Sequence, residues 1–571
     1  MNVLTHQTAS INGVLQKWVD QQPHKRLYAF LDARGHIIED FTYLQFSQRV
    51  DTLAAHLAGN DWLKEGDRVI LCFQPGIEII AALFACAKVG LVAVPAPPLS
   101  AFDVATWVNQ MDHILIDSSA AAWLVCDRTR ELYQEIQHRS GAPESEKAAR
   151  SLRELPLICT STLTTSANAK VSARHHPIAF QQYTSGSTSN PKGVRVSHDN
   201  LIANCLAVVD HEQPIAVTWL PQHHDMGLIG YYLYIAMSGG TTFGFSPRSF
   251  IQNPSIWLET ISRYSATATS VPNFALELCL NARRIPNTAL EQYDLSTLRF
   301  LMVAAEPVSP ETFDAFRNRF ARCGLKRDAF FVAFGLAEFT LAVTSYGKKS
   351  LSVDRRRLAQ GQVSLVTMTT GVAHALPVMS CGRPLGDSDL RIVDSATLIE
   401  VSDGFTGEIW ISGAGLTQGY WDKPEENRKI FEAKITGSVS PQKYYLRTGD
   451  IGFLHEGELF ICGRLKDMII IRGQNIYPED IETLAKNACP ELRSNAVVAF
   501  RSGDDRKEGL TLVAETARGR DFPDETHIIR VIREALQIPS VRVVLVEPKS
   551  VPRTSSGKVR RAKTRTLLKA D

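Results

Sequence analysis

The first hundred residues of the chain alternate between short apolar runs and longer amphipathic runs, and this alternation restricts the possible folds most. The run "DRVILCF" is followed by "IEIIAALFACAKVG", which ends at Gly90, and then by "LVAVPAPP". Short β-branched runs are typical of buried strands, whereas the longer run has the length of a helix with a capping glycine. This order predicts an α/β fold, in which helices cover both faces of a parallel sheet and ligands bind at the carboxyl ends of its strands.

The start of the chain predicts further elements of the same kind. "RLYAFLD" and "HIIEDFT" flank an Ala-Arg-Gly turn and predict two strands, and "YLQFSQRVDTLAAHLAG" after them predicts an amphipathic helix. The stretch "MNVLTHQTASINGVLQKWVDQQ" has no basic leader followed by an apolar core, so it predicts an ordinary amphipathic helix and not a signal peptide. We therefore expect a cytoplasmic protein.

A chain of 571 residues is too long for one hydrophobic core, so at least two domains are expected. The motif "GRLKDMIIIRGQNIYPEDIE" separates a large α/β body from a shorter unit with the order strand, charged turn, strand, helix, strand. We interpret this unit as a small α+β domain that is joined through a hinge near Leu465 and Lys466. The expected boundaries are residues 1–465 for the large domain and 466–571 for the small domain.

Charge and cysteine content exclude several classes of partner. The 62 basic and 60 acidic residues nearly cancel, which gives no reason to expect nucleic acid or a membrane surface. The uncharged stretch "MGLIGYYLYIAMSGGTTFGFS" contains Gly-Gly, Thr and Ser, and "IIAALFACAKVGLVAVPA" contains Lys88, so we expect buried elements and no membrane span. The ten cysteines never occur in a C-x-x-C spacing, so neither a zinc site nor a disulfide framework is expected.

The stretch "YTSGSTSNPKGVRVSH", residues 183–198, has the composition of a phosphate-binding loop. It is not a Walker loop, because Gly186 is followed five residues later by Pro191 and only then by Lys192. Its small residues let backbone N–H groups converge, its hydroxyl groups can donate, and Lys192 carries positive charge. A solvated Ser/Thr turn contains the same residue types, so other residues must decide between the two interpretations.

Charged residues elsewhere support the phosphate interpretation. In "AFGLAEFT", Glu338 follows Gly335 in a setting that suits a carboxylate holding a metal ion beside phosphates, although a helix cap explains it too. In "YLRTGDIGF", Asp450 is predicted in a tight turn between strands. There its carboxylate could accept hydrogen bonds from both ribose hydroxyl groups, although a plain turn residue explains it too. "GRLKD" supplies Arg464, and "PRTSSGKVRR" supplies Lys558 in a loop near the C-terminus.

Six motifs, taken in order, resemble the motif set of the acyl-adenylate-forming superfamily, which includes acyl-CoA synthetases, luciferases and peptide-synthetase adenylation domains. They are "YTSGSTSNPKGV", "LPQHHDMGLIG", "FGLAE", "RTGD", "GRLKDMIIIRGQNIYPEDIE" and "PRTSSGK". The resemblance covers essentially the whole chain. It implies a large N-terminal adenylate-forming domain of layered sheets and helices and a small, mobile C-terminal α+β domain, with the hinge at Lys466.

Within that superfamily the details resemble fatty acyl-AMP ligases, which activate fatty acids as adenylates and pass them to an acyl carrier protein instead of coenzyme A. "VAVPAPP", "WLPQHHDMGLIG" and "AAEPVSPETFDAF" are similar to that branch. The long connection over about residues 346–378 resembles the insertion that is characteristic of it. Because a long connection in a compact domain is usually functional or disordered, we hypothesise that this insertion restricts rotation of the small domain and blocks coenzyme A.

The resemblance implies ATP and Mg²⁺ as cofactors, a fatty acid as substrate and a carrier protein as acceptor. By this resemblance Lys558 bridges the carboxylate and the α-phosphate, Glu338 and Thr188 coordinate Mg²⁺, and His224 lies where the nucleotide and acyl pockets meet. The residues expected to bind the nucleotide are Thr184, Ser185, Gly186, Ser187, Thr188, Lys192, Ala304, Ala305, Glu306, Phe334, Gly335, Asp450 and Arg464.

The adenine motif departs from the usual pattern of the superfamily. Relatives usually have Gly-Ala-Glu where this chain has "AAE" at residues 304–306, and a frequent Tyr is replaced by Phe334. Neither change argues against adenylation. The adjacent His223 and His224 suggest a metal pair, but neighbours on a strand point to opposite faces, so zinc is not expected.

Two other functions stay open from the sequence. A long-chain fatty acyl-CoA synthetase uses the same first step, and it differs in the insertion and in the consumption of coenzyme A. A catalytically silent acyl- or nucleotide-binding protein would keep the fold, but it has no chemical need for Lys192, Glu338, Asp450 and Lys558 at their motif positions.

Overall fold

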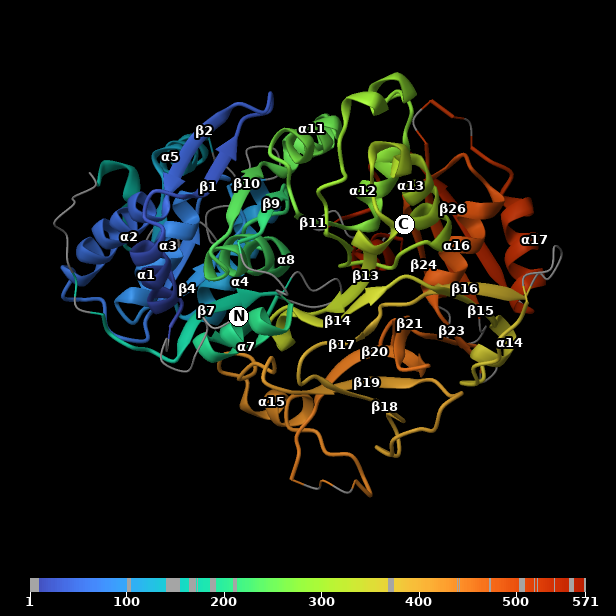
Figure 1. Cartoon of the computed structure of the whole chain (residues 1–571). Coiled ribbons are helices and arrows are strands. Elements are labelled where there is room, and N and C mark those ends of the chain that lie inside the picture. Colours follow the sequence, from blue (N-terminus) through green and yellow to red (C-terminus); the bar gives the residue numbers. More distant parts are fainter. Residues whose placement is uncertain are drawn as a thin grey trace.

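Two large sheets and a separate C-terminal unit organise the chain, as the computed structural model shows (Figure 1). The structure describes residues 10–99, 104–139, 155–163, 171, 173–184, 191–208, 213–367, 374–438, 440, 442–471, 474–502, 509–517, 519–520, 522–538, 540–553 and 559–568.

The first sheet has six strands in the order β6-β5-β3-β4-β7-β8. All neighbours are parallel except β7 and β8, which form an antiparallel pair at one edge. The strands are β3 (Arg68–Cys72), β4 (Val92–Pro95), β5 (Ala122–Val125), β6 (Leu157–Cys159), β7 (Ile178–Tyr183) and β8 (Gly193–Ser197).

The second sheet has nine strands in the order β17-β14-β13-β12-β11-β9-β10-β1-β2. Its six central strands, from β13 to β1, are parallel, and antiparallel strands flank them on both sides. The strands are β1 (Arg26–Leu31), β2 (Ile37–Thr42), β9 (Ile215–Thr218), β10 (Thr241–Phe245), β11 (Ala268–Val271), β12 (Phe300–Val303), β13 (Phe330–Gly335), β14 (Ala342–Gly347) and β17 (Arg383–Pro384).

Helix α3 (Glu78–Lys88) packs on the first sheet, and helix α2 (Tyr43–Ala58), which contacts α3, also contacts β1 and β2 of the second sheet. The residues of α3 from Ile79 to Ala87 are all buried, which is expected for a helix that is apolar on every side. It contacts β3, β4 and β7 as well as helices α1 (Ile11–Gln21) and α2. Gly90 follows it with φ +75°, the left-handed conformation of a helix C-terminus. The strand-helix alternation that the sequence predicts is confirmed here.

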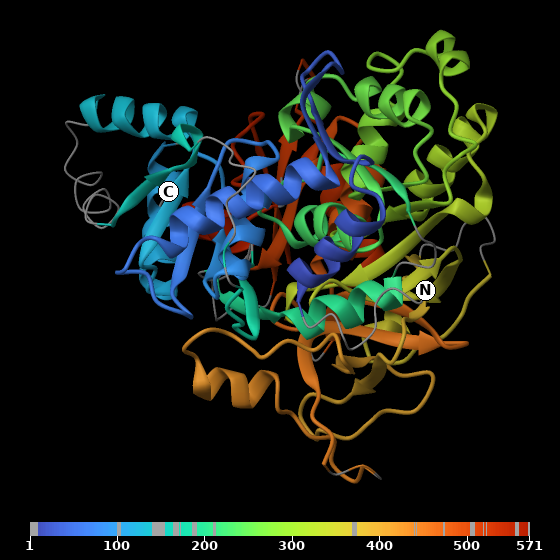
Figure 2. The ribbon, with the colours of Figure 1, turned by 60° about the vertical axis from the view of Figure 1, so that its left-hand side comes forward.

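The remaining helices lie around and between the two sheets (Figure 2). They are α4 (Val104–Ser118), α5 (Asp127–Arg139), η1 (Thr160–Thr162), α7 (His198–Val208), α8 (Asp225–Gly227), η2 (Leu228–Leu233), α9 (Tyr234–Met237), α10 (Pro247–Gln252), α11 (Ser255–Arg263), α12 (Asn273–Leu280), η3 (Asn287–Gln292), α13 (Pro310–Phe320), η4 (Ala321–Cys323), η5 (Arg327–Ala329) and η6 (Ala337–Phe339). Of these, η2 and α9 are buried in the interior. Among the described residues, no helix combines the length and the apolar content needed to cross a membrane.

A four-stranded antiparallel sheet, drawn in orange at the bottom of Figure 1, follows the two large sheets. Its strands are β18 (Asp389–Val393), β19 (Gly407–Ser412), β20 (Leu446–His455) and β21 (Glu458–Arg464), with helix α15 (Pro424–Ile430) in the connection before β20. Trp410 and Tyr445 belong to its own small core.

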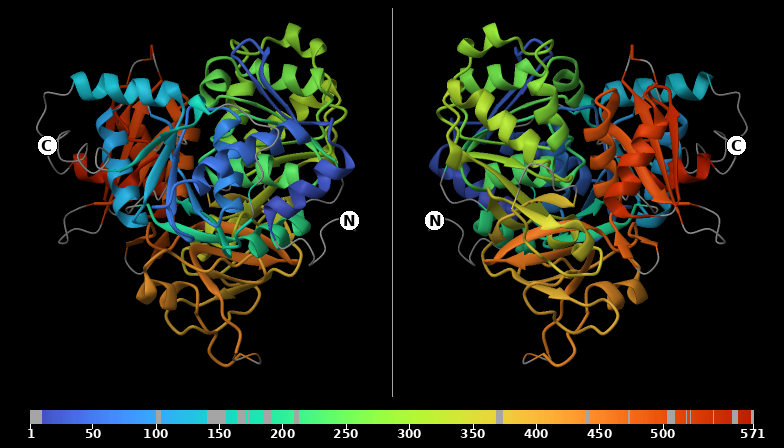
Figure 3. Two further views of the ribbon diagram at one scale, coloured as in Figure 1. Left: turned by 90° about the vertical axis from the view of Figure 1, so that its left-hand side faces the viewer. Right: turned by 90° about the vertical axis from the view of Figure 1, so that its right-hand side faces the viewer.

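The C-terminal unit, drawn in red, lies against one side of this body (Figure 3). Helix α16 (Pro478–Ala488) and helix α17 (Glu525–Leu536) pack on its three-stranded sheet around an apolar core of their own. The other elements are β22 (Ile469–Ile471), β23 (Gln474–Ile476), β24 (Leu492–Arg501), β25 (Leu510–Thr516), β26 (Val541–Val546) and α18 (Arg561–Leu567). The predicted order of strands and helix in this unit is confirmed, whereas the exact boundary at Lys466 stays a prediction.

The segment predicted to be an insertion, called the insertion below, forms a hairpin of β15 (Ser350–Asp354) and β16 (Ala375–Met379), with the short helix α14 (Arg355–Leu358) between them. Residues 368–373 lie outside the described residues. Its apolar side chains pack together with Phe453 and Phe460 of the orange sheet and with Tyr477 of the C-terminal unit. The insertion therefore lies between the two parts that a hinge would move.

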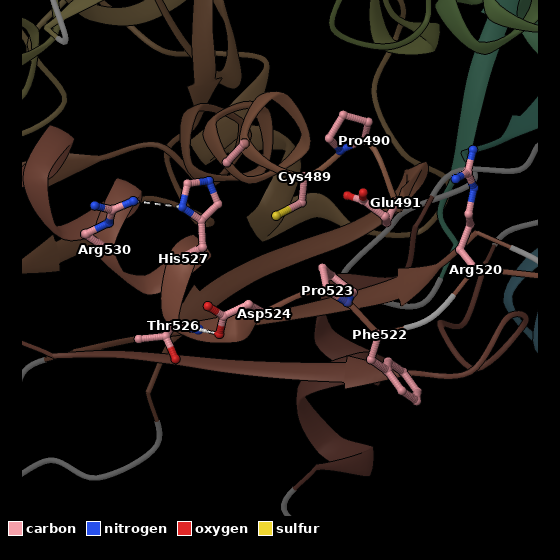
Figure 4. Close-up of a pocket in the computed structure, with 11 residues that line it drawn as sticks. Cys489, Pro490, Glu491, Arg520, Phe522, Pro523, Asp524, Thr526, His527 and Arg530 are labelled. Atoms are coloured by element: carbon pink, nitrogen blue, oxygen red, sulfur yellow. Dashed lines mark hydrogen bonds between the residues drawn. The ribbon is translucent and has the colours of Figure 1, made fainter.

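A surface hollow lies at the C-terminal end of α16, whereas the insertion contacts Tyr477 at the N-terminal end of this helix (Figure 4). Cys489, Phe522 and His527 are among its lining residues, and Arg530 donates a hydrogen bond to Nδ1 of His527 over 3.1 Å. An 11-residue helix spans about 16 Å, so the hollow is well separated from the start of α16.

Candidate active site

The predicted phosphate loop connects the antiparallel strands β7 and β8. Ser185, Gly186, Ser187 and Thr188 lie outside the described residues, but both ends of the loop are defined. At its base the N–H of Thr184 donates to the carbonyl of Lys192 over 3.2 Å. Two further segments hold the second end: a ring nitrogen of His113 lies 2.7 Å from the carbonyl of Pro191, and the N–H of Trp421 donates to the carbonyl of Gly193 over 2.8 Å.

The ammonium group of Lys192 contacts two residues that the sequence analysis did not identify. It forms an ion pair with Glu426 on α15, and it lies 4.9 Å from the ring centroid of Tyr420. The side chains of Lys192 and Glu426 are 28% and 34% exposed, so both are accessible to a ligand.

Glu338 lies in the middle of the single turn η6 and is half-buried. Burial raises the pKa of this carboxyl group, while the hydroxyl of Tyr420, which donates to Oε1 over 2.8 Å, and the charge of Arg464 lower the pKa. The negative charge of Asp225 raises the pKa further. Two carboxylates therefore share one partly buried region, which is an electrostatic setting that favours a divalent cation.

Asp450 and Arg464 are direct neighbours in the register of β20 and β21, and Nε of Arg464 lies 3.0 Å from Oδ1 of Asp450. The prediction that Asp450 lies in a tight turn is wrong, because strand β20 continues through it. The "TGDIG" stretch interrupts the ladder without ending the strand: Gly449 has φ +71°, and the register shifts between Ile451 and Gly452. Asp450 attracts Arg464 and raises the pKa of its guanidinium.

The adenine motif and the "FGLAE" motif follow neighbouring parallel strands. Ala304 comes directly after β12, and Phe334 and Gly335 end β13, so both motifs lie at the same edge of the sheet. Ala305 has φ +74°, a left-handed conformation that costs about 1 kcal/mol for a residue with a side chain. A Cβ on Gly335 would lie 1.9 Å from the carbonyl oxygen of Leu341, so only glycine fits there.

Glu306, the last residue of the adenine motif, contacts the start of helix α12. Its Oε1 accepts a hydrogen bond from the N–H of Phe274 over 2.7 Å. Burial, together with the charge of Arg493, lowers the pKa of Arg553 in the C-terminal unit, and the charges of Glu515 and Glu306 oppose this shift. Lys558 follows five residues later and lies outside the described residues. Arg553 is therefore close enough to the adenine motif to interact with its charge.

His223 and His224 do not lie on a strand, so the reason given for excluding zinc was wrong. Strand β9 ends at Thr218, a turn follows, and His224 is the N-cap of α8. Nδ1 of His224 lies 2.6 Å from Oδ1 of Asp225, while burial lowers the pKa of His223 to about 3. Within the described residues, no group of three or more His, Cys, Asp and Glu side chains is arranged to hold a metal ion.

Lys466 belongs to the same region as the predicted nucleotide residues. Burial lowers the pKa of its ammonium group first, and the charges of Arg464 and Lys192 lower it further, while Asp467 and Asp450 oppose them. The structure thus brings together five of the predicted residues in one charged cluster: Lys192, Glu338, Asp450, Arg464 and Lys466. Tyr420 and Glu426 join this cluster, and the segment "GYWDKPEEN" that carries them gave no sequence signal beyond an aromatic residue followed by acids.

This cluster has the charged groups that a nucleotide-binding site needs. The comparison with protein families shows which kind of nucleotide-binding protein this is. The model for AMP-binding enzymes matches residues 15–421. The chain belongs to the AMP-binding enzyme family. Membership in this family confirms the resemblance on which the sequence expectations were based.

Relatives within the family match almost the entire chain. The chain is 34% identical to the medium-chain-fatty-acid–[acyl-carrier-protein] ligase JamA of Moorena producens, over 98% of this chain and 94% of the relative. It is 32% identical to the 4-hydroxyphenylalkanoate adenylyltransferase of Mycobacterium bovis, over 97% and 91%. Its fold is similar to the crystal structure of a fatty acyl-adenylate ligase from L. pneumophila in complex with acyl adenylate and pyrophosphate, with a TM-score of 0.73 and 32% identity over 99% and 97% of the chains.

Proposed function

We propose that this protein activates a fatty acid with ATP, forming fatty acyl-AMP and releasing pyrophosphate. The observation that carries the proposal is the charged cluster, in which Lys192, Glu338 and the pair of Asp450 and Arg464 meet although they come from three distant parts of the chain. The relatives named above act on fatty acids or on a related carboxylic acid through adenylation or ligation, which supports the same substrate class.

In the proposed reaction a carboxylate oxygen of the fatty acid attacks the α-phosphorus of ATP. The new bond joins this oxygen to the α-phosphorus, and the bond between the α-phosphorus and the bridging oxygen of the β-phosphate breaks. Two anions must approach each other, so the protein contributes mainly charge neutralisation and alignment. Lys558 bridges the carboxylate and the α-phosphate. The β- and γ-phosphates are held by Lys192 and by the loop from Thr184 to Thr188.

The half-buried Glu338 fits a bound Mg²⁺, because Asp225 lies close enough to add its negative charge. Thr188 supplies a hydroxyl ligand in this proposal. When bound, Mg²⁺ neutralises charge on the departing pyrophosphate.

The remaining predicted residues orient the nucleotide and the acyl group. Asp450 accepts hydrogen bonds from the ribose hydroxyl groups, and Arg464 holds this carboxylate in place through the 3.0 Å contact. Phe334 and the backbone of residues 304–306 face the adenine ring. His224, whose Nδ1 is held by Asp225, lies between the nucleotide and the acyl chain in this assignment.

The acceptor of the acyl group is, in this proposal, the phosphopantetheine arm of an acyl carrier protein. The name of JamA supports this acceptor. Besides the apolar packing with Tyr477, the insertion makes polar contacts with the C-terminal unit: Arg355 pairs with Asp480, and the N–H of Asn475 donates to the carbonyl of Ala359 over 2.8 Å. These contacts oppose the rotation about Lys466 that transfer to coenzyme A requires.

Exchange of labelled pyrophosphate into ATP, started by a fatty acid, tests the proposed adenylation. We expect exchange that requires both the fatty acid and Mg²⁺, and a loss of ~10²–10³ in rate for Lys558→Ala, as is usual when one transition-state donor is removed. A silent binding protein would show no exchange. An unchanged rate in Lys558→Ala would overturn the role of that lysine.

A further inference from the structure

Tyr420 is held rigidly between strand β8 and helix α15. It forms an isolated bridge with Val194 of β8, and its side chain is buried. The amide of Asn427 fixes its backbone on both sides, because Oδ1 accepts from the N–H of Tyr420 and Nδ2 donates to its carbonyl, each over 2.8 Å. Its ring meets the edge of Phe431 at 5.1 Å between centroids. The orientation of this tyrosine is thus set before any ligand binds.

The two ends of the Tyr420 side chain contact different parts of the cluster. The hydroxyl donates to Oε1 of Glu338 over 2.8 Å, and the ring lies beneath the ammonium group of Lys192 at 4.9 Å. Burial and the negative charge of Glu338 both raise the pKa of the Tyr420 hydroxyl, so it stays protonated and acts as the donor.

We infer that Tyr420 is a positioning residue that couples the metal-binding carboxylate of Glu338 to the phosphate-binding Lys192. This inference rests on the proposed function, in which Glu338 and Lys192 hold those roles. Its hydroxyl fixes one oxygen of the carboxylate, which directs the second oxygen, and its ring holds the cation at a fixed distance from that carboxylate. Residues that orient a metal ligand in this way commonly change metal affinity by ~10–100-fold when they are removed.

The structure separates the two roles of Tyr420 by atom, which makes them separable by substitution. Tyr420→Phe removes the hydroxyl and keeps the ring beneath Lys192, so it acts on the carboxylate alone. Tyr420→Leu removes both groups. A hydrogen bond to a charged group is worth about 1.5–3 kcal/mol, and this value corresponds to ~10–100-fold in binding.

Calorimetric binding of pyrophosphate, with and without Mg²⁺, tests the inference apart from activity. For the wild-type protein we expect tighter binding with Mg²⁺. In Tyr420→Phe we expect this Mg²⁺-dependent gain to fall about tenfold or more, with binding in the absence of Mg²⁺ unchanged within about twofold. In Tyr420→Leu we expect both values to weaken, because the cation–π contact with Lys192 is lost as well.

Tyr444→Phe is the matched control, because Tyr444 also lies beneath a lysine, Lys434 at 5.0 Å, but is 46% exposed on the surface. It should bind pyrophosphate like the wild type. Equal effects of Tyr420→Phe with and without Mg²⁺, or no effect, would overturn the inference. A wild-type protein that makes no acyl-AMP would instead overturn the proposed function, so the two failures are distinguishable.

Discussion

Arg355 of the insertion and Asp480 of helix α16 form a buried ion pair: Nε of Arg355 lies 2.9 Å from Oδ1 and 2.7 Å from Oδ2, and each side chain is 6% exposed. Burial raises the pKa of Asp480, and the charge and hydrogen bonds of Arg355 oppose this shift. Removing one partner of a buried pair leaves the other charge buried and unpaired, which costs roughly 3–5 kcal/mol. Any rotation that separates α16 from the insertion has to overcome this contact.

The first prediction concerns this contact and the choice of acceptor. The double variant Arg355→Gln with Asp480→Asn keeps the shape of the pair but leaves no unpaired buried charge. We expect it to form several-fold more acyl-CoA than the wild type when coenzyme A is supplied, with acyl-AMP formation retained. Chromatographic quantification of both products measures this.

Arg356→Gln is the control for that experiment, because Arg356 is the next residue and is exposed. It should behave like the wild type. If acyl-CoA stays at the wild-type level in the double variant and also in a variant that lacks the insertion, while both still form acyl-AMP, then the insertion does not exclude coenzyme A.

The second prediction concerns Glu426, whose carboxylate pairs with Lys192 where phosphates are proposed to bind. A competing anion lowers the affinity for pyrophosphate, and a partly exposed pair is worth about 0–1 kcal/mol, so its removal changes binding up to about fivefold. We expect Glu426→Gln to lower the inhibition constant of pyrophosphate by this factor.

The control is Glu425→Gln, which makes the same charge change at an exposed neighbour. Equal effects of the two variants would mean that only the general charge of α15 matters. Weaker pyrophosphate binding in Glu426→Gln would mean that Glu426 holds Lys192 in place and does not compete with the phosphates.

Local patterns predicted the elements of the fold but not the contacts that complete the site. Helix α3 and its capping Gly90 follow from the spacing of neighbouring residues, and the structure confirms them. Tyr420 meets Glu338 across 82 positions and Lys192 meets Glu426 across 234, and no pattern of neighbours encodes such pairs.

Errors in the site arose where a short motif allowed two backbone paths. The glycines around Asp450 suggested a turn. Strand β20 nevertheless continues through them, with only a local break in its ladder, because β19 and β21 flank it on both sides. The motif residues themselves were found because each has a chemical group that phosphate, ribose or metal binding needs. Their assignments, the hinge at Lys466 and the cytoplasmic location stay predictions.

The third prediction concerns the ribose contact. Asp450→Asn removes the charge that pairs with Arg464 and that is proposed to accept two hydroxyl groups. We expect the KM for ATP to rise by ~10-fold or more, because hydrogen bonds to a charged group are lost, with the KM for the fatty acid unchanged. Asp403→Asn, at an exposed position, is the control. A rise in the fatty acid KM of equal size would contradict a role specific to the nucleotide.

The fourth prediction concerns acid stability and the N-terminal helix. Nδ1 of His198 accepts a hydrogen bond from the N–H of Ile11 over 3.4 Å, and burial, with His175 and His176, lowers the pKa of His198 from 6.5 to about 4. The unfolded chain takes up a proton at higher pH than the folded protein, so stability falls as the pH drops from 6.5 towards 4.

Urea denaturation at a series of pH values between about 7 and 4.5 measures this effect. We expect the midpoint of His198→Gln to depend less on pH than that of the wild type, whatever its absolute stability. His24→Gln, at an exposed position, should keep the wild-type slope. An unchanged slope in His198→Gln would show that other groups cause the acid sensitivity.

Mass spectrometry of the reaction products tests the proposed function most directly. The protein is incubated with ATP, Mg²⁺ and fatty acids from short to long, alone, with coenzyme A, and with a carrier protein with or without its phosphopantetheine arm. We predict acyl-AMP in every mixture, acyl transfer only to the carrier that has the arm, and acyl-CoA at background. Acyl-CoA formed as fast as the adenylate is consumed would contradict this and identify an acyl-CoA synthetase.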